Sequence, residues 1–273
     1  MSTDTGVWTY AITGHDRLDG PDGEVDLSWL SGVAEAPVRT IDCAGLAVLA
    51  SDVSLAEFGE QALHENMENL DWLDEVARLH HYVVDAAARL FPLLPVRLAT
   101  VYRDDGAVCA AITGHRDQLL DTLGRIGGRV EWGVKAYAAP DADGDGDAGT
   151  AEHPRAAREP AGAGSGPGLA YLRRRRDKLA AGRESRAAAV HGARTVHADL
   201  AGQATQAVVR PPQSVQLSGA RQPMLLNAAY LLEASEGPSF TAAVAAEATA
   251  HPELQIELTG PWPPYSFAGD DAR

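Results

Sequence analysis

The sequence contains one recognisable metal-binding spacing. Residues Asp141–Glu152 follow the pattern D-x-D-x-D-G-x₅-E, which is the spacing of an EF-hand calcium loop. The flanks do not fit, because Pro140 and a predicted strand precede the pattern and no helix is indicated on either side. Ala148 also occupies the position where a hydrophobic anchor is expected. A tract rich in Asp, Gly and Ala produces such spacings by composition, so we expect no specific metal site.

Other candidate catalytic residues are equally isolated. His80 and His81 are adjacent on a predicted helix, where neighbouring side chains point about 100° apart and cannot chelate one ion together. Cys43 and Cys109 are too few for a zinc cluster, and reduced thiols in a cytoplasmic protein are the simpler interpretation. The chain contains no nucleophile elbow and no phosphate loop, and its glycines at 162–168 follow no strand. We therefore predict no catalytic residue, no metal and no cofactor.

Charge is unevenly distributed along the 273 residues. The formal net charge is −15, with 17 acidic and 5 basic residues in 1–100 but 5 acidic and 10 basic residues in 151–200. An acidic chain repels phosphate, which argues against nucleic acid as the main partner. The basic run Arg173–Arg176 is interpreted either as a patch for nucleic acid or another anionic surface, or as a solvated helix face or a contact to an acidic partner. That partner could be the acidic amino-terminal region itself.

Hydropathy indicates a soluble chain. The longest strongly apolar stretch, Met224–Leu232, is far shorter than the ~20 residues that span a bilayer. The start, Met1–Gly6, has neither the basic nor the apolar region of a signal peptide. We expect a cytoplasmic protein with no membrane partner.

The first hundred residues predict six elements in the order strand, helix, strand, strand, helix, strand. Val7–Ile12 is a predicted strand, Leu27–Val33 a short helix, and residues 38–51 a β-hairpin around Ala44-Gly45. Apolar residues from Trp72 to Leu90 recur at helical spacing. Residues 96–101 form the last predicted strand.

The second half repeats this order after a predicted helix over 106–126 that breaks near Gly114. Its strands are expected at 130–136, 206–210, 224–234 and 254–258, and its helices at 169–200 and 238–250. Residues 139–168 contain no large apolar side chain and are expected to be a disordered insertion.

The fold class predicted from this order is α+β, with two ferredoxin-like βαββαβ sandwiches in tandem. The expected domains are 1–104, a helical connector at 105–128, and a modified second unit at 129–273 that carries the 139–168 loop and a carboxy-terminal strap.

The strap is the tail Thr259–Phe267, which contains three prolines and three aromatic residues. It is interpreted either as a ligand for a partner's groove or as a strap whose Trp262, Tyr265 and Phe267 pack on the second domain of the same chain. We further hypothesise that Arg97 pairs with Glu131 or a nearby carboxylate and locks the domains together. The alternative is that Arg97, Glu131 and Lys135 are separately solvated.

Five segments resemble the GvpF/GvpL family of gas-vesicle accessory proteins. They occur in family order over nearly the whole chain: Trp8–Ile12, Leu94–Thr100, Val130–Lys135 (with Glu131, Trp132 and Lys135), Ala170–Arg173 (with Tyr171), and Gly260–Phe267. Leu98 and Ala99 stand where the family usually has Phe and Gly, and the 139–168 loop is longer and more acidic than expected.

The resemblance implies two ferredoxin-like domains and a non-enzymatic role in the biogenesis of gas vesicles. It implies binding to the hydrophobic shell protein GvpA and to other accessory proteins during nucleation, and an association with the vesicle. The interaction candidates are Arg97, Glu131, Trp132, Lys135, Tyr171, Trp262, Tyr265 and Phe267. A small-molecule sensor with its ligand between the two domains is the alternative function, and an enzyme is the third.

Overall fold

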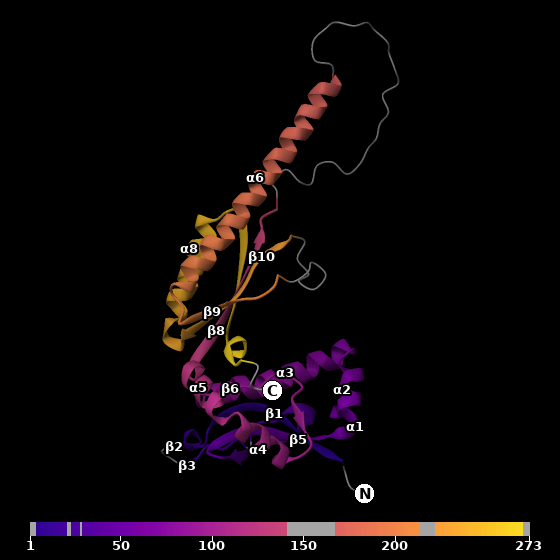
Figure 1. Ribbon diagram of the computed structural model, residues 1–273, viewed down its shortest axis with the longest axis vertical. Helices are drawn as coiled ribbons and strands as arrows, with labels where there is room; N and C mark the ends of the chain where they lie inside the picture. Colours follow the sequence, from indigo (N-terminus) through magenta and orange to yellow (C-terminus); the bar gives the residue numbers. More distant parts are fainter. Residues whose placement is uncertain (1–3, 21–22, 28, 141–166, 213–221, 270–273) are drawn as a thin grey trace.

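The computed structural model describes residues 4–20, 23–27, 29–140, 167–212 and 222–269. It contains two antiparallel sheets that lie one above the other along the long axis (Figure 1). Both expected units therefore contain a sheet and helices. The predicted calcium spacing and most of the predicted loop lie outside the described residues.

The first sheet is built from residues 5–102 and has the strand order β4-β5-β1-β6, with β7 also paired to β1. Its elements, with a small hairpin of β2 and β3 beside it, are β1 (Thr5–Gly14), β2 (Asp19–Gly20), β3 (Gly23–Glu24), β4 (Arg39–Cys43), β5 (Leu46–Ser54), α1 (Leu55–Phe58), α2 (Glu60–Asn66), α3 (Leu70–Ala88), β6 (Leu94–Pro95) and β7 (Val101–Tyr102).

The second sheet has the order β11-β8-β10-β9. Two helices, α4 and α5, connect the first sheet to it in the sequence. The elements are α4 (Asp105–Gly114), α5 (Arg116–Ile126), β8 (Arg129–Ala138), α6 (Pro167–Ala201), β9 (Gln206–Val209), β10 (Met224–Glu233), α8 (Gly237–Ala250) and β11 (Leu254–Trp262). From β8 onward, the predicted order of strand, helix, strand, strand, helix, strand is confirmed.

Local sequence explains several of these boundaries. The β4–β5 hairpin turns at Ala44 and Gly45, which both have positive φ angles of 56° and 83°, as a tight two-residue hairpin requires. Asn69 caps α3 by accepting hydrogen bonds from the backbone N–H groups of Asp71 and Trp72. Gly128, with φ of +79°, follows the end of α5 at Ile126.

Two predicted elements are wrong. Leu27–Val33 is not a helix: Leu27, Leu30 and Val33 are buried, but the backbone reaches them through turns. The Val33 N–H donates to the Tyr10 hydroxyl at 2.8 Å, so its partner is a distant side chain. The predicted strand at 96–101 is replaced by β6 and β7, because the chain turns between them at Ala99, where φ is 65°.

The expectation of reduced thiols is also contradicted. Cys43 at the end of β4 and Cys109 in α4 form a disulfide, with their Cα atoms 4.9 Å apart. Packing of α4 on β4 brings together two residues that are 66 positions apart in the sequence. Sequence spacing alone gave no indication of this contact.

Three clusters of buried apolar side chains hold the sheets and helices together. One lies between the first sheet and α3, around Trp8 and Phe58. Another lies between the second sheet and its helices α6 and α8, around Tyr230 and Phe240. The third includes residues of the first sheet, of α4 and α5, and of β10, together with Phe267 of the tail. The two sheets therefore share one core region.

Candidate functional site at the junction of the two sheets

The tail after β11 lies at the junction of the two sheets. Beyond Trp262, the chain passes the buried Pro263 and Pro264 and forms a single helical turn at Tyr265–Phe267. Phe267 is 3% exposed and belongs to the core cluster that includes residues of both sheets. The tail is thus a strap within the chain, as one of the two hypotheses predicted.

The predicted packing partner of the strap is wrong for two of its three aromatic residues. Trp262 packs edge-on against His81 of α3, with ring centroids 5.3 Å apart. Tyr265 packs against His80 and His81 at 6.4 and 6.3 Å. These side chains therefore contact the first unit, although β11 itself belongs to the second sheet.

His80, which packs against Tyr265, is itself held in place by two hydrogen bonds. Its Nδ1 accepts a hydrogen bond from Trp8 Nε1 at 3.0 Å, and its Nε2 lies 3.1 Å from the carbonyl oxygen of Val96. An indole nitrogen only donates, so Nδ1 is unprotonated and Nε2–H donates to Val96. Burial lowers the pKa of His80 to about 4, and the neighbouring His81 contributes in the same direction. The ring is neutral, as its two hydrogen bonds require.

Glu131 of the second sheet binds the strap at Ser266. Its side chain is on β8 and is buried, and it accepts hydrogen bonds from the backbone N–H of Ser266 at 2.7 Å and from the Ser266 hydroxyl. Arg210, just after β9, lies 3.8 Å from the same carboxylate and also donates to the Ser266 hydroxyl. Glu131 thus fixes the turn that directs Tyr265 onto α3.

Two further arginines bind carbonyl oxygens of the strap. Arg125 of α5 donates to the oxygen of Phe267 at 3.2 Å, and Arg97 donates to the oxygen of Gly269 at 3.4 Å. Arg97 therefore contacts the end of the strap, and its role in locking the two domains together stays a prediction. A salt bridge between Arg97 and a carboxylate stays a prediction.

A small polar pocket lies beside these contacts. It has a volume of about 470 Å³ and is lined by Arg97, Arg210, Tyr265, Ser266 and Gly269. The Tyr265 hydroxyl is buried and has no hydrogen-bond partner among the described residues. Burial raises the pKa of this hydroxyl, and the charges of Asp85 and Glu131 raise it further. The pocket therefore presents the cationic side chains of Arg97 and Arg210, while the Tyr265 hydroxyl stays buried and neutral.

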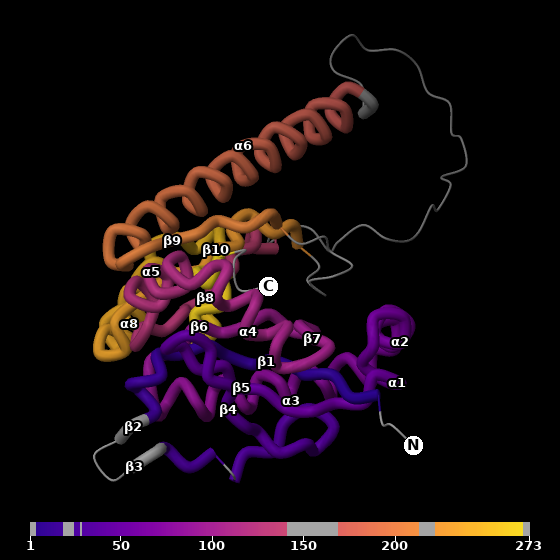
Figure 2. The backbone as a smooth tube through the Cα atoms, turned by 60° about the horizontal axis from the view of Figure 1, so that its bottom comes forward, coloured from indigo at the N-terminus to yellow at the C-terminus, as the bar shows by residue number. Residues whose placement is uncertain are grey.

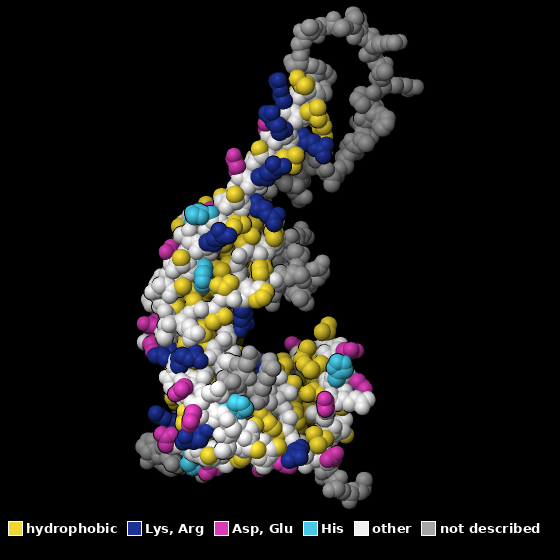
Figure 3. Space-filling model, viewed as in Figure 1, with side chains coloured by type: hydrophobic (Ala, Val, Ile, Leu, Met, Phe, Trp, Pro, Cys, Tyr) yellow, Lys and Arg dark blue, Asp and Glu magenta, His cyan; other side chains and the backbone are white. Residues whose placement is uncertain are grey.

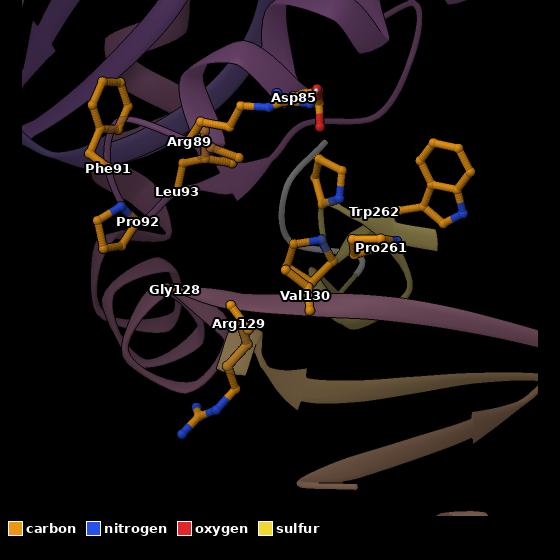
Figure 4. Close-up of a pocket in the computed structure, with 14 residues that line it drawn as sticks. Asp85, Arg89, Phe91, Pro92, Leu93, Gly128, Arg129, Val130, Pro261 and Trp262 are labelled. Atoms are coloured by element: carbon orange, nitrogen blue, oxygen red, sulfur yellow. Dashed lines mark hydrogen bonds and ion pairs between the residues drawn. The ribbon is translucent and has the colours of Figure 1, made fainter. Parts of the chain in front are cut away.

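An apolar cleft of about 280 Å³ lies on the other side of the strap. Figure 4 shows its walls: the end of α3 and the following Phe91–Leu93 on one side, and the start of β8 with Pro261 and Trp262 on the other. The charges at its rim are paired, since Arg89 lies 2.8 Å from Asp85 and Arg129 lies 2.7 Å from Glu233. The cleft is therefore an apolar surface with a neutralised rim, suited to an apolar segment.

Three predicted interaction residues lie elsewhere. Trp132 packs on Phe240 beneath α8, with ring centroids 6.3 Å apart, and its indole N–H has no partner among the described residues. Lys135 is opposite Glu257 of β11 in the sheet register. Tyr171 is 58% exposed on α6. The structure thus brings together Arg97, Glu131, Trp262, Tyr265 and Phe267.

Sequence reasoning missed four residues that hold the strap: His80, His81, Arg125 and Arg210. The two histidines were considered only as metal ligands, whereas they act as a hydrogen-bonded and stacking surface. His80 lies next to the apolar stripe of the predicted helix, which is an available signal for that residue, whereas His81 lies on another face. No comparable signal marked Arg125 and Arg210.

No cluster of three or more His, Cys, Asp or Glu side chains suited to a metal ion occurs among the described residues. Within that part, no helix has the length and apolarity needed to cross a bilayer.

The chain is similar to known proteins over nearly its full length. The family model described as "Gas vesicle synthesis protein GvpL/GvpF" matches residues 6–269. "Gas vesicle protein L" of Streptomyces sp. (strain CB03234) is 37% identical over 98% of this chain and 95% of its own. "Gas vesicle protein F" of the same organism is 29% identical over 96% and 98%.

Solved structures show the same fold. The crystal structure of the gas vesicle protein GvpF from Anabaena sp. PCC7120 matches 97% of this chain and 96% of its own, with a TM-score of 0.63 and 18% identity. That of GvpF from Microcystis aeruginosa matches 97% and 99%, with a TM-score of 0.58 and 20% identity.

Proposed function

Because the chain belongs to the gas vesicle synthesis protein GvpL/GvpF family, we propose that it assists gas vesicle assembly by binding the shell protein GvpA and other accessory proteins. The role is binding rather than catalysis, and its place of action is the cytoplasm, at the growing vesicle. The two sheets with their helices are interpreted as tandem ferredoxin-like units, in line with the confirmed element order from β8 to β11.

The observation that carries this proposal is the apolar cleft at the junction. A shell subunit that exposes an apolar surface to gas aggregates in water unless another surface covers it. The cleft offers Pro92, Val130 and Pro261, and the partly exposed Trp262 lies at its edge. Burial of apolar area contributes about 25 cal/mol per Å², so the shell subunit's own hydrophobicity supplies the driving force.

The edges of the second sheet offer a second type of contact to a partner, through backbone hydrogen bonds. Among the described strands, β9 and β11 are the two edges of the second sheet, and Val209 of β9 is 57% exposed. An edge strand can extend its sheet with an incoming segment through backbone hydrogen bonds. The cleft and the edges together give an extended apolar segment both side-chain and backbone contacts.

The test is co-expression with the shell protein, followed by pull-down at low and high salt. Apolar binding persists when NaCl is raised to about 0.5 M, whereas contacts between exposed charges weaken because the Debye length falls well below ~10 Å. Normal vesicles in a strain lacking this gene, together with no co-purification at either salt, would overturn the proposal.

Two variants locate the contact. Trp262→Glu places a charge at the edge of the cleft and should abolish capture of the shell protein. Trp29→Glu is the matched control, because Trp29 is 55% exposed and lies outside the cleft, and Trp262 is 43% exposed. Equal loss in both variants would contradict binding at the cleft.

A further inference from the structure

The first half of α6 projects from the molecule without support. All residues from 169 to 188 are exposed, whereas Ala189, Ala193, Val196 and Leu200 of the second half pack on the second sheet. About 20 residues at 1.5 Å rise correspond to roughly 30 Å of helix. Figures 1 and 2 show this part extending beyond the sheet.

This projecting half carries both apolar and basic side chains. Leu169, Leu172 and Leu179 are 48%, 60% and 56% exposed, and they share one helix face with Arg176 and Arg183 at spacings of 3, 4, 3 and 4. Residues 169–188 contain seven Lys or Arg and two acidic residues. Figure 3 shows basic and hydrophobic side chains along this helix. We call this surface the basic helix.

A surface of opposite charge lies on α2 and the start of α3. Residues 57–75 contain seven Asp or Glu and no Lys or Arg, and all seven are exposed. Two apolar side chains protrude among them, Met67 at 42% and Leu70 at 77% exposure. We call residues 57–75 the acidic lobe. The two surfaces match in charge and in having exposed apolar residues.

Within one chain these surfaces do not meet, since both are exposed and lie apart in Figures 1 and 2. The intramolecular contact considered for Arg173–Arg176 is therefore not formed. We propose that the basic helix of one molecule binds the acidic lobe of a second copy of this chain.

A single contact joins one helix to one lobe and leaves the other helix and the other lobe of the pair free. Repetition of the contact gives chains or rings, and a closed twofold dimer results where both contacts form within one pair. The exposed leucines and Met67 supply apolar area, while the opposite charges set orientation and association rate. The expected assembly therefore grows with concentration and shrinks with salt.

The first test measures the mass of the full chain in solution by light scattering after size-exclusion chromatography. Species larger than a monomer should appear at about 0.05 M NaCl, and the apparent dissociation constant should rise by about tenfold or more at about 0.5 M. A monomer at both salts overturns the proposal.

The second test separates the two surfaces by neutralising each in a different variant. The helix variant carries Arg175→Gln, Arg176→Gln, Lys178→Gln and Arg183→Gln. The lobe variant carries Glu60→Gln, Glu68→Gln, Asp74→Asn and Glu75→Gln. All eight positions are exposed, so circular dichroism should show wild-type helix content in both variants.

Each variant alone should be monomeric, because it retains only one of the two complementary surfaces. An equimolar mixture should form a discrete dimer and nothing larger, since one intact helix meets one intact lobe. A control with Arg17→Gln, Arg103→Gln and Arg194→Gln, three other exposed arginines, should assemble like the wild type. Failure of the mixture to dimerise, or assembly of either variant alone at wild-type strength, contradicts the proposal.

Discussion

Glu131 is the residue through which β8 controls the strap. Replacing it by Gln keeps the shape but removes the charge that accepts both Ser266 hydrogen bonds and faces Arg210. Hydrogen bonds to charged groups contribute about 1.5–3 kcal/mol each, so Glu131→Gln should lower the free energy of unfolding by about 1–3 kcal/mol. Urea denaturation measures this change.

The control for this substitution is Asp121→Asn. Asp121 is an exposed carboxylate on α5, and its loss should change stability by less than about 0.5 kcal/mol. Limited proteolysis adds a second measurement, because a released strap should be cleaved faster only in Glu131→Gln. Equal effects of the two substitutions would contradict the conclusion that Glu131 holds the strap in place.

His80 makes stability depend on pH in a defined direction. Its pKa is about 4 in the folded state, below the ordinary value of 6.5, so the unfolded chain binds the proton more readily. The stabilisation from the neutral ring is complete above about pH 6.5 and is lost as pH falls towards 4. Between pH 7.5 and pH 5.5, this group should cost about 1.3 kcal/mol of stability.

Thermal or urea unfolding at the two pH values measures this loss, with His80→Gln as the comparison. The variant is expected to be less stable at both pH values, because Gln does not reproduce both ring hydrogen bonds. The fall in stability between pH 7.5 and 5.5 should nevertheless be smaller in the variant by about 1.3 kcal/mol. An unchanged fall would show that other groups cause it.

At the scale of elements, the disulfide joins β4 to α4. Cys43 and Cys109 close a loop of 66 residues, and cross-links of this kind typically contribute about 2–4 kcal/mol. Cys43→Ser with Cys109→Ser should lower the free energy of unfolding by that amount in guanidinium titrations. A thiol reductant should destabilise the wild type and leave the double variant unchanged. No effect of reductant on the wild type would argue against the disulfide.

Gly182 and Gly192 distinguish the projecting half of α6 from its packed half. A Cβ at Gly182 meets nothing within 4 Å, whereas one at Gly192 lies 2.5 Å from Glu253 Oε1 and 3.0 Å from His251 Nδ1. Gly182→Ala should slow hydrogen exchange in residues 169–188 without lowering the melting temperature, because Ala favours helix by about 1 kcal/mol. Gly192→Ala should lower the free energy of unfolding by about 1 kcal/mol or more through crowding. The reverse order would show that the projecting half is packed.

Elements with strong periodicity were predictable from the sequence. The spacing from Trp72 to Ala87 gave α3, and the apolar run at 224–234 gave the central strand β10. Leu27–Val33 failed because a spacing of three also fits buried turns. The site was predictable only in part: the tail's prolines and aromatics marked a strap, but its contacts with His80 and His81, about 180 positions earlier in the sequence, depend on how the two sheets meet.

At the scale of the whole molecule, the strap determines whether the sheets behave as one unit. Phe267 packs in the core cluster that contains Leu94 and Val96 of the first unit and Ala229 and Leu231 of β10. The cleft and the polar pocket both lie between surfaces supplied by the two units. Their shape therefore depends on this packing, and so does any binding that uses them.

Phe267→Ala tests the coupling directly. Truncating a buried Phe costs about 3–5 kcal/mol, and here the lost contacts are those between units. The wild type should unfold in one transition, seen alike by probes in the first and second units. In Phe267→Ala, the two units should separate into two transitions at different urea concentrations. Trp8, in the first core, and Trp132, beside the second, supply the probes when each is kept as a reporter.

Phe240→Ala is the control that separates coupling from simple loss of stability. Phe240 is as deeply buried as Phe267, at 1% against 3% exposure, but its contacts lie within the second core. It should destabilise the protein by a similar amount while the shared cluster remains intact, so both probes should still report one transition. Two transitions in Phe240→Ala and one in Phe267→Ala would place the coupling elsewhere. If the expected pattern appears, Phe267→Ala should also weaken capture of the shell protein, because the walls of the cleft are no longer held at a fixed separation.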